Sequence, residues 1–102
     1  MALYAPHVYT DPAMIAWLEA LTGELPGQAR VLLVLKDGSR VSGTVTVRPC
    51  LQHFADHTEQ PGVNAQVRLD DLVRISQQHV IWLDSVRQVL RLPAPDTSDT
   101  PA

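Results

Sequence analysis

The pattern of apolar positions near the start of the chain is typical of a short amphipathic helix. Apolar side chains recur at helical spacing at Met14, Ile15, Trp17, Leu18 and Leu21. Just before them, Thr10 and Asp11 are suitable N-cap residues, and Pro12 has no amide hydrogen to leave unpaired in the first turn. The pattern predicts a helix over about residues 11–22. Because so short a helix is marginal alone in water, we expect its apolar stripe to cover a sheet or a partner.

From residue 30 onward the pattern becomes that of β-strands. An unbroken apolar run covers residues 31–35, and the turn pair Asp37-Gly38 follows it. Residues 40–48 then alternate, which predicts a second strand whose inner row holds Val41, Gly43, Val45 and Val47. At Gly43 the missing side chain permits a sharp bend or the close approach of another backbone. The two strands therefore form a hairpin.

The middle of the chain is less regular. Residues 49–62 lose the alternation and hold two prolines, which predicts a long loop. Alternation returns over residues 63–69, which predicts a third strand. The pair Asp70-Asp71 that follows it is expected to form a turn.

The end of the chain is compatible with two interpretations. In one, short apolar segments at residues 72–75 and 80–83 are further strands. In the other, residues 79–83 form a strand, Asp84 opens and caps a single helical turn at 84–86, and residues 88–92 form the last strand.

Both interpretations lead to a mainly β fold in one domain. An N-terminal α-helix followed by five short antiparallel strands suits a strongly bent sheet that closes into a small barrel, with the helix at one end. We expect the barrel over about residues 30–92, within a single domain spanning residues 1–92. Residues 93–102 hold three prolines and no large apolar group, which predicts a disordered tail.

The composition is that of a globular domain. Of the 102 residues, 45% are hydrophobic and 19% are charged, which excludes a disordered or collagenous chain. No apolar run approaches the roughly 20 residues that cross a bilayer, and a signal peptide is not recognisable. We therefore expect a cytoplasmic protein that does not contact membranes. Cys50 is the single cysteine, so no internal disulfide forms.

Cationic side chains are concentrated in the middle of the chain. The net charge is −3, yet residues 30–92 hold all eight cationic side chains against six acidic ones. All but Lys36 are arginine, which suits bidentate contacts with phosphate or carboxylate groups. This segment is compatible with an anionic partner such as RNA, although nucleic-acid binders usually carry a stronger basic patch.

The hairpin and the strand after the loop resemble the Sm-like family, including its bacterial host-factor members. The first motif of that family has an apolar strand, a Gly turn, a bending Gly and, after a loop, an Asn before an alternating strand. Gly38, Gly43 and Asn64 stand at these positions, and the layout matches over about residues 12–92. The chain is also similar to a small uncharacterised bacterial family with a variant Sm-like domain. The resemblance implies an Sm-like or SH3-like small barrel that forms homo-oligomers through its strand edges.

Two replacements separate the chain from the Sm-like pattern. Gln60 stands where the family places an Asp four residues before its Asn. Gln78 replaces the Lys of the Lys-His-Ala-Ile stretch that residues 78–81 resemble. The predicted loop is also longer than in the family. These replacements motivate an alternative in which nucleic-acid binding has been lost.

The resemblance and the outward arginines together give a set of candidate RNA-binding residues. Asn64 matches the Asn that the family uses for base recognition, although an Asn at a loop-to-strand junction often makes only a local turn. His79 either hydrogen-bonds or stacks on a nucleotide, or has a structural role. Arg48, Arg68 and Arg74 occupy outward positions, where they meet either phosphates or solvent.

The predicted loop contains the residue types of a metal site. Cys50, His53 and His57 lie in a short span with Asp56 beside them. Their spacing lacks the paired motifs of a structural zinc site, and they converge only if the loop folds back. We therefore expect no metal, and we predict that Phe54 anchors the loop in the barrel.

Three functions follow from these observations. No Gly-rich phosphate loop, no nucleophile in a recognisable turn and no acid pair suited to proton transfer is found, so we expect neither catalysis nor a cofactor. The preferred hypothesis is an Sm-like small barrel that binds RNA weakly in a self-associated form. The alternatives are a protein–protein interaction module that has lost nucleic-acid binding, and a metal-binding loop protein.

Overall fold

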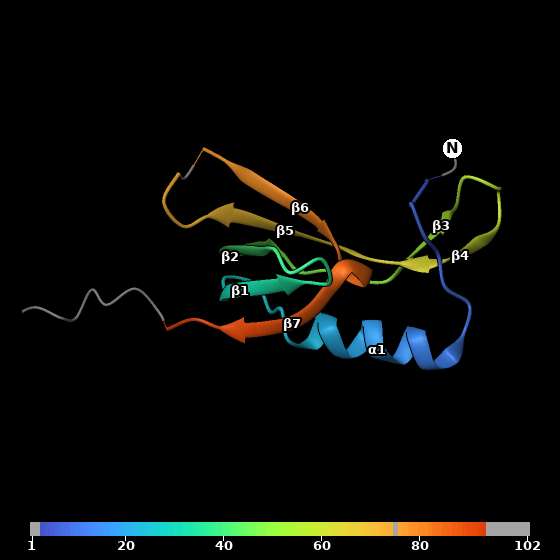
Figure 1. Cartoon of the computed structure of the whole chain (residues 1–102), viewed down its shortest axis with the longest axis horizontal. Helices are drawn as coiled ribbons and strands as arrows, with labels where there is room; N and C mark the ends of the chain where they lie inside the picture. The colour runs from blue at the N-terminus through green and yellow to red at the C-terminus, as the bar shows by residue number, and fades with distance from the viewer. Residues whose placement is uncertain (1–2, 75, 94–102) are drawn as a thin grey trace, which may run out of the picture.

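A computed structural model describes residues 3–74 and 76–93 of the chain. One helix, α1 (Pro12–Gly23), precedes a five-stranded antiparallel sheet and a separate two-stranded hairpin (Figure 1). The sheet has the order β6-β5-β2-β1-β7, with β1 (Arg30–Leu35), β2 (Arg40–Val47), β5 (Gln66–Asp71), β6 (Gln78–Trp82) and β7 (Val86–Arg91). The hairpin consists of β3 (Gln52–Ala55) and β4 (Pro61–Asn64), and a 3-10 turn, η1 (Leu83–Ser85), joins β6 to β7.

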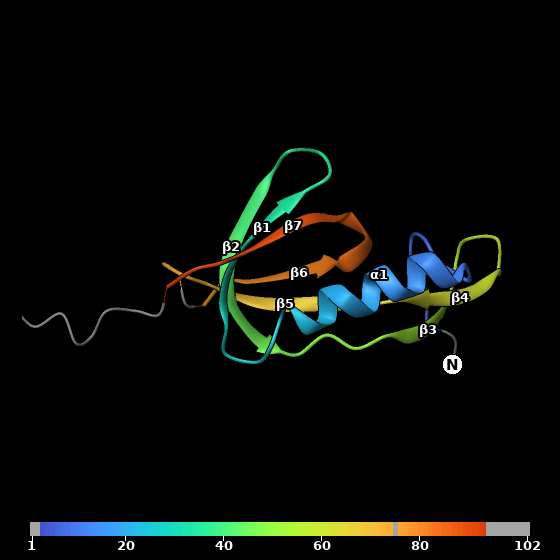
Figure 2. The same ribbon diagram turned by 90° about the horizontal axis from the view of Figure 1, so that it is seen from below.

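The five-stranded sheet is strongly bent but does not close. Figure 2 shows β2 curving through the molecule, with β1 and β7 at one end of the bend and β5 and β6 at the other. In the part of the chain that the structure describes, no ladder joins β6 to β7, so these two strands are the sheet edges. The predicted class, a helix followed by a five-stranded bent antiparallel sheet of the small-barrel type, is confirmed, and the barrel is open. The predicted tail lies outside the described residues apart from Pro93.

The bend in β2 depends on Gly43, as the sequence predicts. A Cβ atom at this position would lie 2.5 Å from the backbone oxygen of Asp70 on β5. Beyond Gly43, the register between β2 and β5 shifts between Val45 and Val47. This irregularity reverses the alternation, because a one-residue change exchanges the two faces of a strand. Val47, predicted on the inner row, is therefore 57% exposed.

Helix α1 covers one end of the core. Asp11 caps it, because its Oδ2 accepts a hydrogen bond from the Met14 amide at 3.2 Å. Leu18 and Leu21 are the buried residues of the helix, and they join one cluster with the inner row of the sheet. The helix contacts β4 and η1, and Figure 2 shows it running along that side of the molecule. Within the described ranges, no helix is long and apolar enough to span a membrane.

The prediction of a long loop over residues 49–62 is wrong, because most of this segment forms the β3–β4 hairpin. Two features hide this hairpin in the sequence. Each strand has only four residues, and polar side chains interrupt the alternation of apolar and polar positions. The connecting turn is built by Asp56, whose Oδ1 accepts hydrogen bonds from the amides of Thr58 and Gln60. The N-terminal segment flanks the hairpin through bridges from Tyr4 to Ala55 and from Tyr9 to Val63.

The second interpretation of the chain end is the correct one. A strand at 78–82, a helical turn at 83–85 and a strand at 86–91 follow one another. Asp84 does not cap the turn, because no side-chain hydrogen bond caps it. The predicted Asp70-Asp71 turn is also wrong: both residues belong to β5, and the turn begins after them. Residues 72–73 form a bend and residue 74 is irregular rather than part of a strand, and residue 75 lies outside the described residues.

Candidate nucleic-acid interface

Asn64 lies at the end of β4 and is fully buried. Its Nδ2 donates a hydrogen bond to the His7 carbonyl at 2.8 Å, and its Oδ1 accepts one from the Ala65 amide at 2.8 Å. The side chain thereby ties the N-terminal segment to the junction between β4 and β5. A base could reach the Asn64 amide only after these bonds had been broken, so RNA contact at Asn64 stays a prediction.

His79 lies on β6 and pairs with the last residue of β5. Its Nε2 is 3.0 Å from Oδ1 of Asp71, and the two side chains are 25% and 23% exposed. Asp71 also accepts hydrogen bonds from the amides of Arg74 and Val73. Hydrogen bonds from Arg74, His79 and Val73, in that order, lower the pKa of Asp71 to about 2. His79 therefore helps to hold the turn between β5 and β6, and a nucleotide contact there stays a prediction.

Arg48 and Arg68 are brought together in one surface hollow. We call it the Arg48–Arg68 hollow; its volume is about 220 Å³, and its lining also includes Val47, Cys50, Gln52, Gln66 and Val80. The register explains this grouping, because Val47 lies opposite Arg68 on β5, and Arg68 lies opposite Val80 on β6. Cross-strand partners share a face, so these three side chains form a row across three strands.

The surface of this row has a mixed character. Val47 and Val80 are 57% and 52% exposed, and both arginines are exposed as well. The two glutamines in the lining add neutral donors and acceptors, and no acidic residue lines the hollow. Two cationic side chains beside exposed apolar groups and amides can hold a phosphate backbone and bases at the same time. Arg74 is exposed in the turn after β5 and does not line this hollow.

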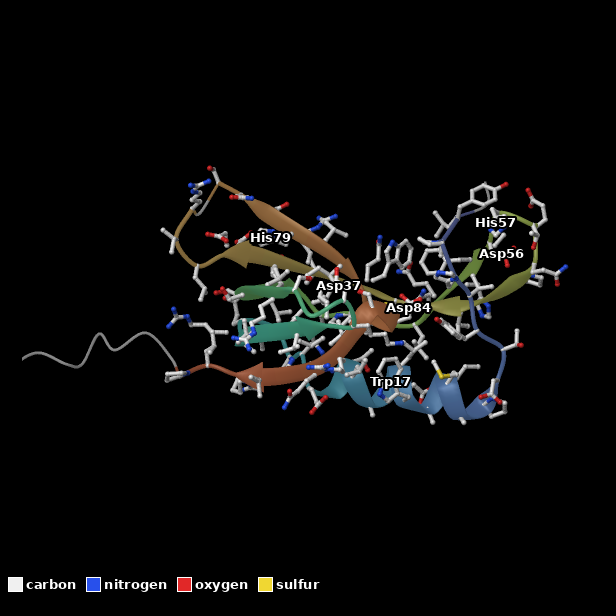
Figure 3. All side chains as sticks on the ribbon, in the orientation of Figure 1. Trp17, Asp37, Asp56, His57, His79 and Asp84 are labelled. Carbon is white, nitrogen blue, oxygen red and sulfur yellow. The ribbon has the colours of Figure 1, made fainter. Side chains whose placement is uncertain are left out.

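The four residues weighed as metal ligands do not form a site. His53 lies on β3, while Asp56 and His57 lie in the β3–β4 turn at the far end of the hairpin (Figure 3). Cys50 is exposed and lines the Arg48–Arg68 hollow instead. Across residues 3–74 and 76–93, no group of three or more His, Cys, Asp or Glu side chains could hold a metal ion. Asp56 is already used by its turn, where hydrogen bonds from Thr58 and Gln60 lower its pKa.

Phe54 anchors the hairpin, as the sequence predicts. It is 8% exposed, and its ring packs edge-on against Trp82 of β6, with ring centroids 5.2 Å apart. The hairpin is therefore fixed to the main sheet by an aromatic pair. Trp82 has one side engaged in this contact and is half-buried.

Sequence reasoning missed a second and larger cavity. We call it the Asp84 pocket; its volume is about 460 Å³, and its lining includes His7, Tyr9, Leu35, Lys36, Asp37, Trp82 and Asp84. Asp84 is 8% exposed, and its Oδ2 accepts a hydrogen bond from the Tyr9 hydroxyl at 2.8 Å. The available signal was a lone acid inside an apolar stretch, residues 80–86, where a buried acid needs a partner. Nothing in the local sequence points to Tyr9, which is 75 residues away.

The strand order, the bend at Gly43 and the helical lid define a protein with an Sm-like fold. The chain belongs to the family described as a domain of unknown function, DUF3247, which matches residues 2–92. It is similar to XC5848 from Xanthomonas campestris, whose crystal structure is described as adopting a novel variant of the Sm-like motif. The two chains are 45% identical with a TM-score of 0.87, and the match covers 91% of this chain and 100% of XC5848. No match is found among the curated proteins. The resemblance to a variant Sm-like family is confirmed.

Proposed function

We propose that this protein is a non-catalytic RNA-binding protein that binds single-stranded RNA across the Arg48–Arg68 hollow in a self-associated form. The observation that carries the proposal is the grouping of Arg48 and Arg68 with the exposed side chains of Val47 and Val80. Two of the RNA-binding candidates found in the sequence, Arg48 and Arg68, thus share one surface.

The charges of the hollow favour a polyanion. In the described ranges neither Arg48 nor Arg68 takes part in an ion pair, so both guanidinium groups are available to phosphates. Since the whole chain has a net charge of −3, this attraction is local rather than general. Weak binding with a modest dependence on salt follows for each copy, because few phosphates are neutralised.

The sheet edges favour self-association. Among the described residues, strands β6 and β7 each pair with one neighbour, and each carries an exposed apolar side chain, Val80 and Leu90. An unpaired edge is a template for a strand of another copy. Pairing of β6 in one copy with β7 in the next would repeat the hollow along the assembly, and RNA bound to several hollows would gain affinity through multivalency.

Anisotropy titrations with labelled uridine-rich and adenine-rich oligonucleotides at low salt test the RNA proposal. We expect R48Q and R68Q each to weaken binding several-fold and to reduce the salt slope by about 1. The matched control is R40Q, which removes the same charge at the start of β2, outside the hollow. If folded wild-type protein gives no anisotropy change up to high micromolar concentration, the proposal of RNA binding is wrong. If R40Q weakens binding as much as R48Q and R68Q do, the RNA is not bound at the Arg48–Arg68 hollow.

Self-association is tested separately by native mass spectrometry and sedimentation over a range of concentrations. We expect a defined species larger than a monomer, because edge pairing adds a full strand of backbone hydrogen bonds. A monomer at every concentration, with and without RNA, would contradict self-association. It would not affect the test of RNA binding with R48Q and R68Q.

A second candidate function is a protein–protein interaction module that has lost RNA binding. The engagement of both polar atoms of Asn64 inside the protein favours it. A pull-down with and without nuclease distinguishes the two functions. An unchanged set of partners after nuclease treatment supports the interaction module, and the loss of every partner supports RNA binding.

A further inference from the structure

The Asp84 pocket lies between three segments that are distant in sequence. The N-terminal segment contributes His7 and Tyr9, the β1–β2 turn contributes Asp37, and the end of β6 with η1 contributes Trp82 and Asp84. In Figure 3, Asp37 and Asp84 lie at the centre of the molecule, away from His79 at the outer end of β6. The pocket is therefore separate from the β5–β6 turn and does not share its lining with the Arg48–Arg68 hollow.

The carboxylate of Asp84 is buried with a neutral partner. Only 8% of the residue is exposed, and the Tyr9 hydroxyl donates to its Oδ2. Among the described residues no cation is within ion-pair distance of Asp84. A buried carboxylate is costly unless it is paired, and one neutral hydrogen bond offsets only part of that cost.

The other oxygen of Asp84 is accessible. Among the described residues, Oδ1 of Asp84 has no hydrogen-bond partner. Every fully buried side-chain oxygen or nitrogen in these residues does have a partner, so Oδ1 is not fully buried. Oδ1 is therefore reached by solvent, and the space beside this residue is the pocket that it lines.

Two basic side chains line the pocket without pairing with Asp84. Lys36 lines the pocket, but its Nζ lies over the ring of Trp17, 5.1 Å from the ring centroid. His7 contributes its backbone carbonyl to Asn64 and is exposed. Asp37 adds a second carboxylate to the lining, and its Oδ1 accepts hydrogen bonds from the amide and hydroxyl of Ser39. Asp37 and Asp84 outnumber Lys36 in the lining, which favours a cationic ligand over an anionic one.

Apart from Ser85, the rest of the wall is apolar. Leu35, Trp82, Pro6 and the ring of Tyr9 line it, and the volume of about 460 Å³ falls within the range of small-molecule sites. An apolar wall with a single buried charge is complementary to a molecule with an apolar body and one charged end. An aromatic wall beside the charge adds a favourable surface for a cation.

We propose that the Asp84 pocket binds a small organic cation, a primary ammonium group on a short apolar stem, with the ammonium group at Asp84 and the stem against Leu35 and Trp82. The ammonium group supplies the missing countercharge, and its hydrogens bond to Oδ1. The stem covers the apolar wall. This site requires neither RNA nor self-association, so it stands independently of the proposed function.

Titration of ¹⁵N-labelled wild-type protein by NMR at pH 7 tests the proposal with three probes of six carbon atoms each: hexylamine, hexan-1-ol and hexanoate. We expect hexylamine to shift the indole resonance of Trp82 and the amides of residues 84–85 at millimolar concentration or below. Hexan-1-ol should bind about tenfold or more weakly, because it lacks the charge-assisted bond. Hexanoate should not bind. Equal affinity for hexylamine and hexan-1-ol, or no shifts with hexylamine, overturns the proposal without any mutation.

The variant D84N tests the role of the carboxylate. Its side-chain oxygen can still accept the Tyr9 hydrogen bond, so the fold is expected to persist, and the dispersion of the NMR spectrum checks this. We expect D84N to bind hexylamine about tenfold or more weakly. The matched control is E19Q, which removes the same charge on the exposed face of α1 and should bind as the wild type does. Unchanged affinity in folded D84N, or equal weakening in E19Q, would contradict the assignment.

Discussion

The backbone of Gly43 on β2 lies so close to Asp70 on β5 that a Cβ atom at Gly43 would be 2.5 Å from the Asp70 carbonyl oxygen and 2.8 Å from Cβ of Leu69. Real Cβ atoms do not approach backbone oxygens this closely, so no other side chain fits. This contact allows the two strands to stay paired while β2 bends. The bent sheet thus depends on the absence of one methyl group.

We expect G43A to lower the free energy of unfolding by about 1–3 kcal/mol, because the β2–β5 pair must move apart to admit the methyl group. Urea unfolding followed by circular dichroism measures this loss. The control is G23A at the end of α1, where an added Cβ meets nothing within 4 Å and the backbone is not in the left-handed region. G23A should be neutral or slightly stabilising. A G43A protein as stable as wild type would show that the strands are not tightly packed here.

The sequence predicts what depends on local pattern. The helix, the first hairpin and the bending glycine are short-range features, since the periodicity of apolar residues and the turn pair Asp37-Gly38 determine them. The second hairpin escapes prediction because four-residue strands with polar side chains have too little alternation to recognise. The alternation of residues 40–48 predicts the wrong face for Val47, because a bulge depends on the partner strand, which the local sequence does not reveal.

In the candidate sites, too, local features can be predicted from the sequence and long-range contacts cannot. Arg48 and Arg68 were predicted to face outward, and they do, but their common hollow results from pairing between three strands. A family motif points to Asn64, but the motif does not reveal that the Asn64 amide already donates a hydrogen bond to the His7 carbonyl. The contact between Tyr9 and Asp84 joins residues 75 positions apart, and tertiary packing alone creates it.

The Tyr9 hydroxyl is expected to stabilise the fold up to alkaline pH. Partial burial, then the hydrogen bond to Asp84 and the charge of Asp84, raise the pKa of Tyr9 to about 12. A raised pKa in the folded state means that the stabilisation is present below pH 10, the unfolded value, and is lost as the pH rises from about 10 to about 12. In Y9F this pH dependence should disappear, and at pH 7 the variant should be less stable by about 1 kcal/mol.

Urea unfolding of wild type and Y9F at a series of pH values between 7 and 12 measures the difference in their free energies of unfolding. The contributions of the other titrating groups cancel in this difference. The control is Y4F, because Tyr4 donates to Glu59 at 3.2 Å in an exposed pair. Y4F should differ little from wild type at pH 7. Parallel curves for wild type and Y9F across the alkaline range would contradict the expected role of the Tyr9–Asp84 bond.

Asp71 is expected to make the turn between β5 and β6 sensitive to acid. Its pKa is lowered to about 2, first by the Arg74 amide and then by His79 and the Val73 amide. A lowered pKa in the folded state means that the stabilisation is present above the unfolded value near pH 4 and is lost as the pH falls toward 2. We expect the amides of residues 73 and 74 to shift over this range in wild type and not in D71N. The control D70N should titrate like wild type, because Asp70 accepts only from the Gln78 side chain among the described residues. Identical acid titrations of wild type and D71N at these amides would rule out this turn contact.

Phe54 is expected to hold the β3–β4 hairpin without contributing to the rest of the fold. It is buried against Trp82 but lies outside the main core cluster, to which α1 and the five-stranded sheet contribute. Truncation in F54A should cost the hairpin about 3 kcal/mol, because the aromatic contact is lost and a cavity remains. Since elements with separate packing open separately, amide exchange should become faster in β3 and β4 while β1 and β2 keep their protection. F54L, which retains most of the volume, should show a smaller effect, and H53A, on the exposed side of the same strand, should show almost none. Loss of protection in β1 and β2 as large as that in β3 would instead make Phe54 part of a single cooperative core.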